Sequence, residues 1–253
     1  MIPKSVIEFF NDIDTPTSLD FKKQSIPEFK HQHEFLQWII HTSGWPYLPL
    51  ELPGVPYAEM YKEALALEDL FVMHRTHPNE NADYAHRGWK SICLHGEAWD
   101  KTNHWEVYPE NKGKTQVDIE YRWCPEIVER CPETTRYFKE VYPYHNYQRL
   151  RFMWLDPQGY IQPHRDRNEN YLQPINIALN NPAGCEFKME GKGYVPFKDG
   201  GSACLVDIGN LHSVWNNSDT PRIHMIAHAP WKPAEFTKIV IDSLKGLIKC
   251  HTI

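Results

Sequence analysis

Residues 163–166 read Pro-His-Arg-Asp, so a histidine and a carboxylate stand two residues apart at His164 and Asp166. Alternate residues of a β-strand point to the same face, and these two side chains can therefore approach one point. A third candidate ligand, His212, lies far enough along the chain for several strands to return. Two histidines and one carboxylate leave three positions of an octahedral iron(II) open, as an oxygenase needs to bind a cosubstrate and dioxygen. We expect His164, Asp166 and His212 to form the metal site and catalytic centre.

Arg222 completes this pattern, ten residues after His212 and at the start of the next strand-like run. A guanidinium at that place can bind the distal carboxylate of 2-oxoglutarate through two parallel hydrogen bonds, while the 2-oxo acid end chelates the iron. Each part of the pattern is weak alone, because a chain with fourteen histidines often contains an H-x-D by chance. The strand context and Arg222 together favour a metal site.

The second half of the chain holds the strands that must position these residues. Seven short runs of strand-forming residues are separated by turn residues, with turns expected at 157–159 and 180–184. The expected strands cover residues 147–156, 160–164, 174–179, 185–190, 203–207, 211–216 and 222–229. Such a series is typical of a jelly roll or barrel, and not of a parallel sheet with crossover helices. We expect a mainly β fold with helical additions on a double-stranded β-helix core (jelly roll, cupin-like).

The remaining expected elements are helices, one further strand and a loop. Amphipathic spacing and turn residues predict helices over 31–41, 57–71, 125–141 and 233–249, a strand over 88–95, and a proline-rich loop over 46–56. The last helix packs on the barrel in one interpretation and forms a dimer contact in another. We expect a single domain over residues 1–253. Its parts are a helical and loop region (1–86), a β-helix core (87–230, catalytic segment 147–230) and a C-terminal helix (231–253).

Composition and charge exclude several classes of protein. The net charge is −6 and no run of lysine or arginine occurs, so we expect no nucleic-acid partner. No apolar run reaches the ~20 residues of a membrane span and no apolar leader follows the N-terminus, so we expect a cytoplasmic protein without a membrane partner. The six cysteines are scattered without a C-x-x-C motif, which favours reduced thiols over disulfides or a zinc site. The sequence leaves the oligomeric state open.

Four stretches of the second half carry a resemblance to a known family. They are RLRFMWLDPQGYIQPHRD at 149–166, NNPAGC at 180–185, HSVWNNS at 212–218, and Arg222. Together they resemble the aspartyl/asparaginyl β-hydroxylase family, whose relatives include free-proline hydroxylases. The resemblance implies a double-stranded β-helix, Fe(II), 2-oxoglutarate and O2, and C–H hydroxylation with release of succinate and CO2. It implies a small-molecule or peptide substrate, hydroxylated as an amino acid or on a peptide side chain.

The sequence departs from this family's pattern at positions near the expected cosubstrate. Some members lack the carboxylate ligand, whereas Asp166 completes the triad here. The best-studied branch carries an R-x-H motif that aligns with Pro-Ile-Asn at 174–176, so Asn176 keeps a hydrogen-bonding group and the cation is lost. A serine that helps to hold 2-oxoglutarate in that branch aligns with Met153. The resemblance thus implies Arg222, Asn176 and Met153 as cosubstrate contacts, and it does not carry over peptide Asp/Asn hydroxylation.

Strand alternation extends the expected pocket to two arginines. If Met153 faces the lumen, Arg151 and Arg149 face it too, and either can bind a substrate carboxylate. In the alternative interpretation, both arginines lie at the barrel mouth in salt bridges with the helical region. His224 and His228 share the parity of Arg222 and are expected to be structural or to support other residues, not to bind metal.

Trp215, Trp89 and Ser91 also lie on strands of the expected core. Trp215 has the parity opposite to His212 and is expected in the core. Trp89 and Ser91 lie on the expected strand 88–95, and nothing in the sequence decides whether they reach the pocket.

Three functions compete. The leading hypothesis is a 2-oxoglutarate-dependent oxygenase, in which the protein positions a C–H bond and excludes water. A cupin-type metalloenzyme that does not use 2-oxoglutarate shares the barrel and needs no Arg222. A non-catalytic ligand-binding barrel, with the helices over 31–71 and 233–249 as its interface, predicts no iron affinity and indifference to replacing Asp166.

Overall fold

The computed structural model of this chain describes residues 32–74, 84–143, 147–170, 172–228 and 233–250. Within them, eleven strands form one antiparallel sheet with the order β1-β9-β6-β11-β5-β10-β7-β8, and β3 joins β2, β4 and β5 beside this path. The strands are β1 Tyr47–Leu50, β2 Val72–Met73, β3 His86–Gly96, β4 Arg122–Trp123, β5 Arg149–His164, β6 Ile175–Ala178, β7 Cys185–Met189, β8 Gly193–Tyr194, β9 Ser202–Val206, β10 His212–Asn216 and β11 Arg222–His228.

Strand β5 belongs to both halves of this sheet. Its first half, from Arg149 to Leu155, pairs with β11, and its second half, from Tyr160 to His164, pairs with β10. From β6 to β11 the chain passes between the half that holds β9, β6 and β11 and the half that holds β10, β7 and β8. This alternation is the strand order of a jelly roll. The expected double-stranded β-helix core is confirmed.

The turn expected at residues 157–159 is instead a bend within β5. Gln158 takes a positive φ of 58° at this point, yet the strand continues to His164. The reason is β3, which is eleven residues long and pairs with β5 on both sides of the bend, from His86 to His95. Turn-forming residues therefore bend the strand without ending it, and the prediction of two separate strands was wrong.

Six helical segments with α or π geometry flank the sheet in the described residues. They are α2 Gln32–Ser43, α3 Tyr57–Leu65, α4 Pro125–Val128, α5 Pro132–Arg136, a π-helical turn Tyr137–Val141, and α6 Pro233–Cys250. Short 3-10 turns cover Glu68–Leu70, Trp105–Val107, Pro109–Asn111 and Gln116–Asp118. The helices expected over 31–41 and 233–249 are present as α2 and α6, although residue 31 lies outside the described part.

Three expectations about the flanking elements were wrong. The helix expected over 125–141 is in pieces, because Pro132 starts a new helix after Cys131, whose backbone is not helical. The expected loop over 46–56 contains β1, which pairs with β9 and accommodates Pro49 because it is an edge strand. The helix expected over 57–71 ends at Leu65, and a 3-10 turn follows it.

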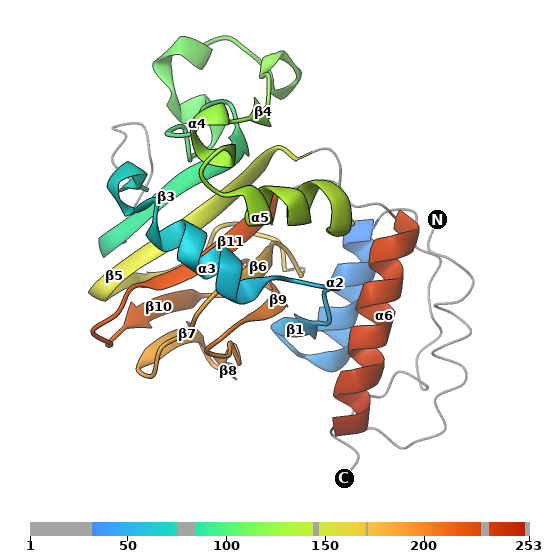
Figure 1. Cartoon of the computed structure of the whole chain (residues 1–253). Helices are drawn as coiled ribbons and strands as arrows, with labels where there is room; N and C mark the ends of the chain where they lie inside the picture. Colours follow the sequence, from blue (N-terminus) through green and yellow to red (C-terminus); the bar gives the residue numbers. More distant parts are fainter. Residues whose placement is uncertain (1–31, 75–83, 144–146, 171, 229–232, 251–253) are drawn as a thin grey trace.

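Two apolar clusters lie on opposite faces of the first half of the sheet. The larger cluster joins the helices to the outer face, as Figure 1 shows for α3 and α5 in front of β11 and β6. Ile223 and Met225 of β11 belong to it, together with Phe152 of β5. The smaller cluster lies between the two halves of the jelly roll and includes Leu155, Phe187 and other side chains from β6, β9 and β10. The inner face therefore has an apolar wall beside its polar residues.

Helix α6 packs against the barrel, as one of the two interpretations predicted. It contacts β1, and its Val240 and Leu244 are fully buried. The backbone N–H of Glu51, just after β1, donates to the Ser243 hydroxyl at 3.1 Å. No helix among the described residues combines the length and apolar composition that crossing a membrane requires.

The bend in β5 places Gly159 where a side chain would collide with neighbouring backbone. A Cβ atom there would lie 2.7 Å from the carbonyl oxygen of Asp156 and 2.8 Å from that of Arg87. Both oxygens belong to backbone that cannot move without disturbing the β3–β5 pairing. We expect Gly159→Ala to lower the free energy of unfolding by ~1–3 kcal/mol in urea denaturation.

Gly246→Ala is the matched control, because a Cβ on this exposed residue of α6 meets nothing within 4 Å. Replacing a helical glycine in open space should stabilise the protein by ~0.5–1 kcal/mol. Equal stability of the two variants would contradict the close backbone approach at the bend.

Candidate active site

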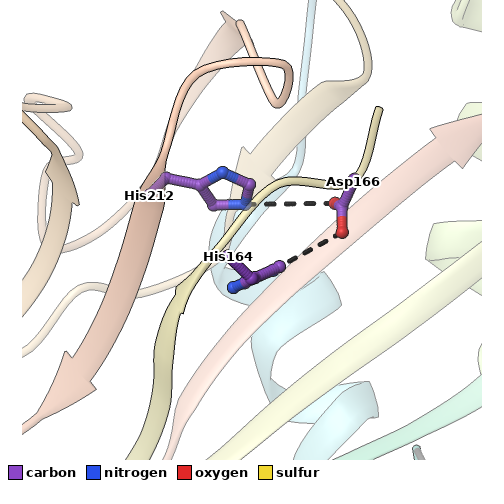
Figure 2. Close-up of side chains that lie close together, drawn as sticks. All are labelled: His164, Asp166 and His212. Carbon is purple, nitrogen blue, oxygen red and sulfur yellow. Dashed lines mark ion pairs between the residues drawn. The ribbon is translucent and has the colours of Figure 1, made fainter. Parts of the chain in front are cut away.

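Neighbouring strands bring the predicted metal ligands together. His164 ends β5, His212 begins β10, and the two residues are direct partners in the β5–β10 pairing. Asp166 follows two residues after His164, and its backbone N–H donates to the Ile208 carbonyl at 3.0 Å. One potential ligand atom from each of the three side chains lies within 4.8 Å of the others. Figure 2 shows both imidazoles directed at the carboxylate, with 3.4 Å from His164 Nε2 to Oδ1 and 3.9 Å from His212 Nε2 to Oδ2.

Backbone carbonyls orient both imidazoles. His164 Nδ1 lies 2.8 Å from the Gln162 carbonyl oxygen, and His212 Nδ1 lies 2.9 Å from that of Asn210. A carbonyl only accepts hydrogen bonds, so each Nδ1 carries the proton and each Nε2 presents a lone pair to the centre. This tautomer and donor set fit a divalent iron.

Burial keeps the second histidine in the neutral form that a metal requires. It lowers the pKa of His212 to about 4, and His164 beside it acts in the same direction. Aromatic rings hold both imidazole planes, since Tyr84 stacks on His164 at 4.0 Å and Phe187 stacks on His212 at 5.4 Å between centroids. The centre is therefore arranged for metal binding around neutral pH.

The triad lies in a cavity of about 530 Å³ enclosed by the two halves of the jelly roll. All eight residues predicted as site residues line this cavity. The structure therefore brings them together, and their individual roles remain predictions. Phe187, Ile208 and Val214 give the cavity apolar walls beside the metal-site residues.

Arg222 is buried in the cavity wall, with 6 % of its surface exposed. Its Nη2 lies 3.0 Å from His224 Nδ1, its Nε donates to Asn181 Oδ1 at 3.4 Å, and its guanidinium carbon lies 5.6 Å from the centre of the Phe197 ring. None of the described residues offers it a carboxylate. Burial lowers the pKa of Arg222 to about 10, so it stays charged at neutral pH.

His224 links Arg222 to Asn176. Its Nδ1 is within hydrogen-bonding distance of both the Arg222 guanidinium and the Asn176 side-chain amide. Burial, followed by the charge of Arg222, lowers the pKa of His224 far below its usual value, so the ring is neutral. Its Nε2 is buried without a hydrogen-bond partner among the described residues. His224 thus has the supporting place expected of it, whereas the side chain of His228 lies outside the described part.

Arg149 and Arg151 point into the cavity together with Met153, as the alternation along β5 predicted. The intervening Leu150 and Phe152 join the outer core. Arg151 Nη1 donates to the Thr102 carbonyl at 2.6 Å. Neither arginine forms an ion pair with any described residue, so the described part of the helical region offers no support for the alternative of salt bridges.

The segment before β5 supplies cavity residues that the sequence did not reveal. His74, Asn103, His104 and Glu106 line the cavity from short turns and irregular segments, where no periodicity marks a facing side chain. Trp89 of β3 also lines the cavity, so this tryptophan does reach the pocket.

The places of Ser91 and Trp215 are also settled. Ser91 does not line the cavity and instead hydrogen-bonds His74 Nδ1 at 2.6 Å, behind the wall. Trp215 lies outside the pocket and is only half-buried. Its ring stacks on that of Tyr160, with 5.1 Å between the centroids, along the outer side of β10 and β5. The prediction of a core position for Trp215 was therefore wrong.

A family model for aspartyl/asparaginyl beta-hydroxylases matches residues 56–232 of this chain, more than half of its length. The chain belongs to this family. Membership of this family confirms the enzyme class that we expected from the sequence, a 2-oxoglutarate-dependent hydroxylase that uses iron(II) and O2. The match includes β3 to β11, and therefore every residue that we predicted for the site.

Solved structures that are similar to this chain have low sequence identity to it. A viral collagen prolyl hydroxylase from Paramecium bursaria Chlorella virus 1, solved with 2-oxoglutarate, is 13 % identical, with 74 % of this chain and 98 % of that chain covered and a TM-score of 0.38. A prolyl-4-hydroxylase from Pseudomonas putida is 12 % identical, with 78 % and 98 % covered and a TM-score of 0.38. No curated protein sequence matches the chain. The assignment rests on the family match and on the strand order.

The triad makes a direct prediction for metal binding. We expect His164→Ala and His212→Ala each to weaken Co(II) binding by ~100-fold or more, because removing a ligand exceeds the 10–100-fold cost of losing a residue that supports one. Asp166→Ala should weaken it strongly but less completely, since relatives without this carboxylate remain active. Isothermal titration calorimetry measures the three constants.

His104→Ala serves as the control, because His104 lines the same cavity but lies beside Glu106 and outside the triad. Its Co(II) affinity should equal that of the parent. Parent-like binding by both histidine variants of the triad would refute the site.

Proposed function

We propose that the protein hydroxylates an amino acid or a peptide side chain at an iron(II) held by His164, Asp166 and His212, with 2-oxoglutarate anchored by Arg222. One observation carries this proposal, which is the convergence of the triad in a cavity whose wall holds a buried arginine without a carboxylate partner. A planar guanidinium matches the distal carboxylate of 2-oxoglutarate in geometry and charge. The products are the hydroxylated substrate, succinate and CO2.

Bound iron(II) supplies the activation of O2 that accompanies decarboxylation of 2-oxoglutarate. The chain's own residues bind, orient and exclude water. His164 and His212 present their Nε2 lone pairs, because carbonyls hold their Nδ1 protons. Phe187 and Ile208 keep the walls apolar, so that water does not compete for the reacting centre.

Arg222, Asn176 and Met153 form the proposed cosubstrate side of the cavity. His224 adds to our prediction here, because its Nδ1 contacts both the Arg222 guanidinium, which donates to it, and the Asn176 side-chain amide. Met153 replaces the family's serine with an apolar contact, so more of the binding energy falls on Arg222. Arg149 and Arg151, farther along β5 at the other end of the β5–β11 strand pair, form the proposed substrate side.

We also propose that residues 1–253 act as one domain in the cytoplasm, without nucleic-acid or membrane partners. The net charge of −6 and the lack of a basic run support the first exclusion. The two alternative functions explain less of the cavity. A cupin-type enzyme that does not bind 2-oxoglutarate leaves Arg222 buried without an anion, and a non-catalytic barrel gives no reason for the triad's convergence.

Replacing Arg222 separates the leading function from the cupin alternative. Arg222→Ala should raise the apparent KM for 2-oxoglutarate on the order of a hundredfold, which corresponds to a loss of ~3 kcal/mol for a buried charge pair that loses one partner. Arg222→Lys should fall between, because it keeps the charge and loses the planar fork. Succinate release at varied 2-oxoglutarate measures both constants.

Two controls accompany this experiment. Arg136→Ala removes an exposed arginine of α5 that pairs with Glu133, and it should leave the KM unchanged. Co(II) affinity should stay at the parent value in every arginine variant, because none of them removes a ligand. If Arg222→Ala uses 2-oxoglutarate as well as the parent does, Arg149 or Arg151 holds the cosubstrate and the proposed orientation is reversed.

A further inference from the structure

Two neighbouring arginines of β5, Arg151 buried and Arg149 half-buried, stand on the substrate side of the cavity. Arg151 is 5 % exposed, and Arg149 precedes it by two residues on the same face of β5. Among the described residues, Arg151 donates a hydrogen bond to the Thr102 carbonyl, and its buried Nε has no partner there. Neither guanidinium forms an ion pair in the part of the chain that the structure describes, and the compensating charge of Asp166 raises the pKa of Arg151 less than burial lowers it.

This arrangement is electrostatically unfavourable in the free protein. Burial lowers the pKa of Arg151 to about 9, and the charge of Arg149 acts in the same direction. Burial lowers the pKa of Arg149 as well. Both groups remain charged at neutral pH, and a buried charge is stable only when a partner compensates it. A bound anion is the missing partner.

The charges around the cavity also leave a positive surplus. Arg149, Arg151 and Arg222 line it, against the two carboxylates of Glu106 and Asp166, whereas Arg167 donates to Gln173 Oε1 at 3.2 Å and has further partners. Iron(II) and the two carboxylates of 2-oxoglutarate cancel each other, so the cofactors do not remove this surplus of one, which equals the net negative charge of a free acidic amino acid. Glu106 lies 3.2 Å from His104 and is well exposed, so it does not neutralise the two arginines of β5. We therefore expect the substrate to supply the negative charge that compensates this positive surplus.

We propose that the substrate is a small molecule with two carboxylates, such as a free acidic amino acid, clamped by Arg149 and Arg151. This inference rests on the proposed function. Residues two apart on a strand are separated by about 6.6 Å, a distance that suits two carboxylates joined by a short carbon chain. The size is limited because about 530 Å³ must also hold 2-oxoglutarate.

The test compares acids with their amides on the full-length protein loaded with Ni(II) and saturating 2-oxoglutarate, where no turnover occurs. Isothermal titration calorimetry gives the affinities for L-glutamate, L-glutamine, L-aspartate and L-asparagine. We expect at least one acid to bind tenfold or more tightly than its amide. Each of Arg149→Gln and Arg151→Gln should reduce this preference severalfold, and the double variant should abolish it. Arg136→Gln should keep it in full.

The variants must retain the parent's circular dichroism spectrum and its Ni(II) and 2-oxoglutarate affinities, which shows that fold and cofactor site are intact. Absence of binding by both acids, equal binding of acid and amide, or an unchanged preference in the double variant would overturn the inference while leaving the cosubstrate site standing. Failure of the parent to bind 2-oxoglutarate at all would instead refute the proposed function.

Discussion

The pairing of β5 with β10 is the constraint on which the site depends. It places His164 directly opposite His212, and a shift of one residue in that register would turn one imidazole to the outer face. The same strand carries Arg149 and Arg151 on its other half, beyond the bend at Gly159. Because β3 pairs across the bend, the metal centre and the two arginines are held in one rigid arrangement. The cavity is thus organised by a single strand.

Charge is the second organising feature. Arginines are rarely buried without partners, because desolvation of the guanidinium is costly. Here Arg222 and Arg151 are both buried in one cavity, and neither has a carboxylate partner among the described residues. The simplest physical account is that anionic small molecules complete the structure. One is the cosubstrate at Arg222, and the other is the substrate at Arg149 and Arg151, toward the other end of the β5–β11 strand pair.

The sequence predicted those parts of the site that follow from strand parity. His164 on β5, Arg222 on β11 and the inward direction of Arg151 all depend on a period of two, which the sequence displays. Asp166 joins the site from the bend that follows β5, and not from the strand on which it was expected. The bend in β5 was missed, because turn residues alone do not reveal that a partner strand will hold the chain extended. Cavity residues such as His74 lie in irregular segments, where only the tertiary structure decides what faces inward.

The account's central claim is that iron(II) and 2-oxoglutarate bind together in this cavity. Anaerobic titration of the iron(II)-loaded protein with 2-oxoglutarate tests it most directly, through the visible metal-to-ligand absorption band of the chelate. We predict that the band appears and saturates at one equivalent of 2-oxoglutarate per chain. Tight iron(II) binding with no such band at any 2-oxoglutarate concentration would contradict the account and favour a cupin-type enzyme.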